Sequence, residues 1–205
     1  MQSYKDLNLI YQGGMLSISG RFLDSLEGCP QQVTGSFLAN NNQLTSLSGG
    51  PSIVADDYFC SSNILTDLVG CASHIPGEFY CNNNRLTSLV GGPQTVDGEY
   101  QCSDTLITDL VGCASHIGGS LTSWNSIKSL VGIHKIIKRC SRMLFDVDQI
   151  KQGGIGLLMI ANLSVISDHN EPFEIISTYL GTGTKGMMEC SKVLTSMGYG
   201  NYAKL

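Results

Sequence analysis

Residues 79–96 read FYCNNNRLTSLVGGPQTV, and this order of residue types returns along most of the 205-residue chain. The stretches 58–75 and 100–117 align with it position by position, and TDLVGCASHI stands unchanged at 66–75 and 108–117. Self-similarity at a fixed period of this length is the sequence signature of stacked repeats. The pattern therefore predicts a solenoid in which each coil is formed by one repeat of the sequence.

The apolar positions of the repeat form columns that predict the core. Two columns consist mainly of leucines, which lie three residues apart in each repeat. A third column holds an aromatic residue or leucine, and a fourth, two positions further on, often holds cysteine. The aromatic column is Leu16, Phe37, Tyr58, Phe79, Tyr100 and Leu121. A single coil of this length cannot bury its own apolar side, but stacked coils bury these columns as one continuous core. Each coil is expected to contribute a short strand, and neighbouring strands pair in parallel about 4.8 Å apart.

Two further columns predict turns. The asparagine column is Asn42, Asn63, Asn84 and Asn125, with Thr105 in place of one asparagine. An amide side chain can satisfy backbone groups where the chain leaves a strand, so we assign this column a structural role. The glycine column is Gly28, Gly49, Gly70, Gly91, Gly112 and Gly132. It predicts a turn that needs positive φ or a close backbone approach.

The repeat resembles the leucine-rich repeat, in particular its short bacterial effector-type subclass. One unit reads Phe/Tyr-x-Cys-x-x-Asn-x-Leu-Thr-Ser/Asp-Leu-x-Gly, and it matches the L-x-L-x-x-N-x-L pattern over about residues 14–132. The chain departs from that pattern in placing cysteine where leucine or valine is usual, and most of its units are one residue longer. The resemblance implies an α/β solenoid built from a stack of short parallel strands.

The period is lost after residue 132, where the composition also changes. Residues 1–132 hold four basic and eleven acidic residues, a net charge of −7, while residues 133–205 hold eight and six, a net charge of +2. We expect 1–132 to form the solenoid, with an N-terminal capping strand, and 133–205 to form a helical domain that covers its open end. Helices are predicted over residues 150–163, 171–180 and 185–197, and the basic cluster over 135–142 is interpreted as a solvated helix face.

Composition narrows the class of protein. The net charge of −5 argues against a general nucleic-acid binder, and no apolar run reaches the roughly 18 residues of a membrane span. The opening MQSYKDLNLI lacks the pattern of a signal peptide, so a cytoplasmic location with reduced thiols is expected. The coils and the ending Gly-Tyr-x-x-Tyr-Ala-x-Leu, residues 198–205, also resemble repeat proteins encoded by large tailed phages, which implies the cytoplasm of a bacterial host.

No set of residues in the sequence indicates catalysis, a cofactor or a metal site. The eight cysteines include no closely spaced pair of the kind that binds zinc. Cys60, Cys81 and Cys102 recur once per coil and are interpreted as core residues. His74 and His116 are two coils apart, about 10 Å, which is too far for one metal ion. We therefore expect a protein without enzymatic activity, without a cofactor and without a metal.

The alternation of side chains along each strand identifies the residues that leave the core. Three outward rows follow, and one of them stacks acidic residues while the next stacks leucine and aromatic residues. Like charges at strand spacing are destabilising in themselves, and exposed aromatic residues in one patch indicate an interaction surface. The candidate partner-binding residues are Leu38, Asp57, Phe59, Glu78, Tyr80, Asn82, Glu99, Gln101 and Trp124. The competing interpretation is that aromatic stacking only stabilises the sheet.

These observations favour a protein-protein interaction module. The leading hypothesis is a phage-encoded binder or inhibitor of a host defence or regulatory protein, with a basic surface on that partner and the strand face as the site. The alternative hypothesis is a structural or assembly protein that self-associates through residues 133–205.

Overall fold

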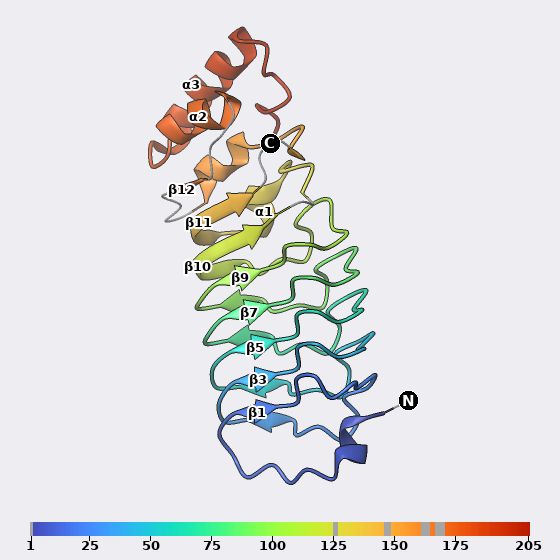
Figure 1. Cartoon of the computed structure of the whole chain (residues 1–205). Helices are drawn as coiled ribbons and strands as arrows, with labels where there is room; N and C mark the ends of the chain where they lie inside the picture. The colour runs from blue at the N-terminus through green and yellow to red at the C-terminus, as the bar shows by residue number, and fades with distance from the viewer. Residues whose placement is uncertain (1, 125–126, 146–148, 161–164, 167–170) are drawn as a thin grey trace.

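The computed structural model is a solenoid of stacked parallel strands with helices at its C-terminal end (Figure 1). It describes residues 2–124, 127–145, 149–160, 165–166 and 171–205. Successive coils rise along one axis from the N-terminal end to the C-terminal end (Figure 1). The predicted fold class, a strand stack with a helical cap, is confirmed.

One line of strands runs the length of the stack. It follows the order β1 (Leu16–Ser17), β3 (Phe37–Leu38), β5 (Tyr58–Phe59), β7 (Phe79–Tyr80), β9 (Tyr100–Gln101), β10 (His116–Ser123), β11 (Arg139–Phe145) and β12 (Val165–Ile166). Each pair is parallel, and from β1 to β10 the paired residues are 21 apart, as for Phe59 and Tyr80. The period of the sequence is therefore the register of the sheet.

A second line of short strands forms where each coil returns. β2 (Gln32–Val33) pairs with β4 (Ile53–Val54), and β6 (His74–Ile75) pairs with β8 (Thr95–Val96), which pairs in turn with the start of β10. The residues of this line that point inward are Val33, Val54, Ile75, Val96 and Ile117, and all are buried. The core lies between the two lines of strands and consists of the predicted columns.

The described asparagines of the column have the predicted structural role of satisfying backbone groups. The amide of Asn63 spans two coils: its Oδ1 accepts the backbone N–H of Leu44 at 3.0 Å, and its Nδ2 donates to the carbonyls of Ala39 and Cys60 at 3.0 and 3.1 Å. Asn42 and Asn84 make the same contacts one coil away on either side. Asn125 lies outside the described residues, so its predicted role is not described.

The glycine column occupies left-handed turns, also as predicted. All six glycines have positive φ, from 75° at Gly132 to 96° at Gly70. A Cβ on Gly112 would lie 2.3 Å from the backbone nitrogen of Val90 in the coil below. Glycine is needed there for the sign of φ and for the close approach of two coils.

The residue three places before each turn glycine shows a further regularity, which explains the alternation of serine and aspartate in the repeat. At this position each side chain accepts a hydrogen bond from the backbone N–H two residues ahead. The residues are Ser25, Ser46, Asp67, Ser88, Asp109 and Ser129. Serine and aspartate side chains both make this local turn bond. The alternation therefore leaves the conformation of the turn unchanged.

Two expectations for the C-terminal part are wrong. Residues 139–145 form the strand β11, so Arg139 and Arg142 lie on a strand instead of on a solvated helix face. Residues 150–163 do not form one helix: the described part contains only a short 3-10 helix, η3 (Ile155–Met159). Its glycines at 153, 154 and 156 disfavour a longer helix. The domain boundary at residue 132 stays a prediction.

The other predicted helices are present. After the short helix α1 (Ile133–Ile136), α2 (Glu171–Thr178) and α3 (Gly183–Ser196) fall within two residues of the expected ranges 171–180 and 185–197. α2 packs against β12 and α3 packs against η3, and Phe173 and Leu194 are fully buried. These helices stand at the C-terminal end of the stack (Figure 1).

Candidate protein-binding face

The outer surface of the strand line β3, β5, β7 and β9 carries the predicted site residues in two adjoining rows. Successive positions of each row are paired residues of neighbouring strands, so Leu38, Phe59, Tyr80 and Gln101 stand side by side in register. Each of these four side chains is half-buried, which leaves part of it accessible at the surface of the sheet. We call these four residues, together with Asp57, Glu78 and Glu99, the strand face.

Aromatic stacking is the central feature of the strand face. The rings of Phe59 and Tyr80 stack with centroids 4.6 Å apart and an angle of 11° between their planes. Directly behind them, the buried rings of Tyr58 and Phe79 meet in a tilted arrangement with centroids 6.0 Å apart. The two strands thus carry an aromatic pair on each face of the sheet, one buried in the core and one at the surface.

The acidic row runs beside the aromatic row. Asp57 accepts the backbone N–H of Glu78 at 2.9 Å through Oδ1, and Glu99 accepts the hydroxyl of Thr122 at 3.1 Å through Oε1. Gly77 leaves room for Asp57, because a Cβ at position 77 would lie 2.2 Å from Oδ1. These partners position Asp57 and Glu99 without neutralising their charge.

Tyr80 belongs to the aromatic row and interacts electrostatically with the acidic row. Burial raises the pKa of Tyr80, and so do the neighbouring carboxylates of Glu78, Glu99 and Asp57. The phenol therefore stays a hydrogen-bond donor at pH values above those at which an ordinary tyrosine ionises. The strand face thus combines an apolar strip with negative potential, a combination suited to a basic surface with apolar side chains.

Hydrogen bonds within the sheet occupy the third outward row, which consists of Asn40, Ser61, Asn82, Ser103 and Trp124. Ser61 donates its backbone N–H to Asn40 Oδ1 at 2.8 Å and its hydroxyl to Asn82 Oδ1 at 2.5 Å. At the end of the row, Ser103 Oγ accepts the backbone N–H of Trp124 at 3.0 Å. Asn82 therefore has a structural role that sequence reasoning missed, and the alternation of asparagine and serine along the row was the signal for it.

Trp124 and Thr122 show where the strand face ends. Thr122 continues the aromatic row in register, but it is only 4% exposed. Trp124 is 38% exposed and follows β10, at the C-terminal end of the third row. The accessible part of the aromatic row therefore runs from Leu38 to Gln101, and Trp124 borders it instead of extending it.

The cysteine and histidine columns lie away from the strand face. Cys60, Cys81 and Cys102 are fully buried, as predicted, and all eight cysteines of the chain are free thiols. His74 pairs with Asp97, with 3.0 Å between Nε2 and Oδ2, on the opposite line of strands. Within the described part of the chain, no three side chains of His, Cys, Asp and Glu are arranged to hold a metal ion.

Apolar side chains are also exposed outside the predicted site. One row borders the turn glycines: Val69, Val90, Val111 and Val131 are each between 42% and 52% exposed. A second group belongs to the N-terminal coil and the segment that leads into it. Its members are Leu9, Ile10, Met15 and Phe22. Sequence reasoning missed both groups, although the valine row follows the period of the repeat.

The fold defines the class of protein: a parallel-strand solenoid in which the repeat of the sequence sets the spacing of the coils. Comparison of the chain with protein-family models, curated proteins and solved structures finds no match. No helix among the described residues has the length and apolar character needed to cross a membrane.

Proposed function

We propose that this protein is a non-enzymatic binding module that holds a partner protein against its strand face. The observation that carries the proposal is the stacked Phe59–Tyr80 pair beside the row Asp57, Glu78 and Glu99. Aromatic residues are enriched where binding energy concentrates. Adjacent like charges destabilise a sheet, and the hydrogen bonds that Asp57 and Glu99 accept within the sheet do not remove this repulsion.

The partner is a protein with a basic surface, since the acidic row provides the complementary charge. We further propose that the chain acts in the cytoplasm of a bacterial host and inhibits or redirects a host defence or regulatory protein. This part rests on the resemblance of the coils, and of the ending Gly198 to Leu205, to repeat proteins of large tailed phages.

A structural or assembly role is the second candidate. It is favoured by the pocket of about 330 Å³ that Met187, Met188 and Leu205 line with neighbouring residues of α3 and the C-terminal segment. Met188 is 59% exposed and Leu205 is 48% exposed. An apolar surface at this end would serve association of the helical part with another copy of the chain.

Affinity capture of the tagged chain from bacterial host cells, followed by mass spectrometry, tests the proposal. We expect one foreign protein in stoichiometric amount, and we expect its recovery to be lost with the double variant Phe59→Ser/Tyr80→Glu. Recovery of copies of the chain alone would contradict the binding function and support the assembly role. Undiminished recovery of the foreign protein by the double variant would remove the strand face as its site.

A further inference from the structure

The two ends of the solenoid are closed differently. At the C-terminal end α2 packs against β12, the last strand of the line. At the N-terminal end the short helix η1 (Tyr4–Leu7) is hydrogen-bonded to the turn of the first coil. There the backbone N–H groups of Tyr4 and Lys5 donate to the carbonyls of Ser25 and Glu27 at 3.1 and 3.0 Å.

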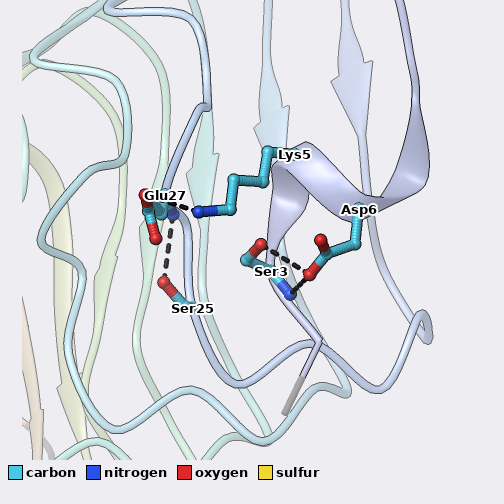
Figure 2. A network of polar contacts seen from close by, with 5 residues as sticks. All are labelled: Ser3, Lys5, Asp6, Ser25 and Glu27. Carbon is cyan, nitrogen blue, oxygen red and sulfur yellow. Dashed lines mark hydrogen bonds and ion pairs between the residues drawn. The ribbon is translucent and has the colours of Figure 1, made fainter.

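We call residues 3–7 the N-terminal cap, and its side chains make polar contacts within the cap and with the first coil. Lys5 Nζ lies 2.7 Å from Glu27 Oε1, and Asp6 Oδ2 accepts both the backbone N–H and the hydroxyl of Ser3 at 2.8 and 2.7 Å (Figure 2). Ser25 Oγ accepts the backbone N–H of Glu27 at 3.1 Å (Figure 2). Lys5 and Asp6 therefore have their partners within the cap and the turn of the first coil.

β1 leaves one edge open. Leu16 and Ile18 donate their N–H groups to the carbonyls of Ser36 and Leu38 in the next coil. Because hydrogen bonding alternates along a strand, the backbone groups of Met15 and Ser17 point to the opposite edge. In the described part of the chain β3 is the only strand that pairs with β1, so this edge is available to another strand.

The open edge lies in an apolar surface. Among the residues of the first coil and its lead-in segment, Ile10 is 85% exposed, Phe22 72%, Met15 61% and Leu9 42%. Residues 7–20 contain no charged side chain. Strand edges of proteins that stay monomeric are commonly protected by charges, proline or bulges, and neither a charge nor a proline occurs in this stretch.

The conformation of Phe22 sets the first coil apart. Its φ is +59°, in the left-handed region that disfavours a bulky side chain. The residues at the same position of the following coils are Gln43, Ile64, Arg85 and Leu106, and none of them has positive φ. Strained backbone conformations cluster at functional sites, so the φ of Phe22 supports a contact here in addition to the exposure of its side chain.

We propose that two copies of this chain associate end to end through this surface, with the open edges of β1 pairing antiparallel. In a two-fold contact the same patch of each copy faces the other copy, so a charge in the patch lies near its own counterpart. Such a contact is therefore favoured where the surface is uncharged and disfavoured where like charges would meet. The strand face, with its acidic row, would repel its own copy, whereas residues 7–20 at the N-terminal end carry no charge to oppose the contact.

Antiparallel pairing occupies the open β1 edge of both copies. No open β1 edge is then left for a third copy, so the assembly closes at two chains. Ile10, Met15 and Phe22 are buried in the contact. The strand faces of both copies remain free, so the dimer can form with or without the partner of the proposed function.

Sedimentation velocity on the full chain, from low micromolar to submillimolar concentration, tests the proposal. We expect a species of twice the 22.0 kDa chain mass that dissociates on dilution, and a single-chain mass throughout for Met15→Lys/Phe22→Asn. The matched control is Leu106→Lys, since Leu106 is 62% exposed at the position of Phe22 four coils further on. This control is expected to dimerise like the unmodified chain.

A single-chain mass for the unmodified protein at every concentration would overturn the proposal. So would a dimer that persists in Met15→Lys/Phe22→Asn, or a continuous series of larger assemblies. Should circular dichroism show that the double variant is unfolded, Ile10→Glu in the exposed lead-in segment replaces it, with the same expected result. Phe59→Ser/Tyr80→Glu is expected to leave the dimer intact, which separates this proposal from the strand-face function.

Discussion

Replacing Asn63 by alanine lowers the free energy of unfolding by about 3 kcal/mol, a large part of the roughly 5–15 kcal/mol that stabilises a typical domain. The change leaves the N–H of Leu44 without its acceptor. The carbonyls of Ala39 and Cys60 each lose one of two amide donors and keep Asn42 and Asn84, respectively. Each unsatisfied buried group costs about 1–3 kcal/mol. Denaturant unfolding followed by circular dichroism measures the difference.

Two variants control for this prediction. Asn63→Thr is expected to lose less stability, because Thr105 occupies the same column and donates its hydroxyl to the Cys102 carbonyl at 3.0 Å. Asn83→Gly changes an exposed asparagine with a φ of 55°, which glycine adopts easily, and its loss is expected to stay within about 1 kcal/mol. A loss for Asn63→Ala no larger than that for Asn83→Gly would contradict the assigned role of the column.

Alkaline pH destabilises the solenoid through its buried thiols. Burial raises the pKa of both Cys29 and Cys102 from 9.0 to about 12. The unfolded chain therefore releases these protons at lower pH than the folded protein, so stability is complete below about pH 9 and falls as the pH rises towards 12. At pH 10 each thiol accounts for a loss of about 1.4 kcal/mol. The measurement is the free energy of unfolding between pH 8 and pH 10.

The variant Cys102→Ala separates this effect from general alkaline damage. Alanine is accommodated in this column, because Ala39 occupies the equivalent position three coils earlier and is fully buried. We expect the variant to lose less stability than the unmodified chain between pH 8 and pH 10, by about 1.4 kcal/mol. Equal losses in the two proteins would show that the buried thiol does not determine the pH dependence.

The sequence predicted the solenoid well where the period is constant. Paired residues of the strands from β1 to β10 are 21 apart, so columns of the sequence become rows of the structure. After β10, insertions in the sequence interrupt the period, so the next coil is not recognisable from it. Ile117 pairs with Cys140 and Leu121 with Met143, so both spacings exceed the period, and an irregularity lies between Ile117 and Ser120. A change of one residue, as between Leu121 and Met143, reverses the apparent sides of a strand.

A signal for the hidden coil was nevertheless present. Gly153 stands one full period after Gly132 and has a φ of 84°. A Cβ there would lie 2.4 Å from the backbone of Leu130 and Val131, about as close as at Gly70 and Gly112. The glycine column thus extends one coil further than the leucine columns, because Lys151 stands where the next leucine was expected.

The candidate site was partly accessible to sequence reasoning. Alternation along the strands correctly placed Phe59 and Tyr80 outside the core, and the period put them in contact. It could not show that Asn82 accepts a hydrogen bond from Ser61, or that Thr122 is buried. Those features depend on side-chain geometry between coils and on the local path of β10, which a period does not specify.

Titration of the purified, captured partner against the chain tests the central claim most directly. The account predicts that Phe59→Ser/Tyr80→Glu weakens the affinity by about 100-fold or more, and that added salt weakens binding to the unmodified chain because the acidic row is screened. The matched control is Val90→Ser, which changes a 52% exposed side chain at the turns, away from the strand face, and is expected to bind normally. Unchanged affinity of the double variant would contradict the account, whatever the affinity of Val90→Ser.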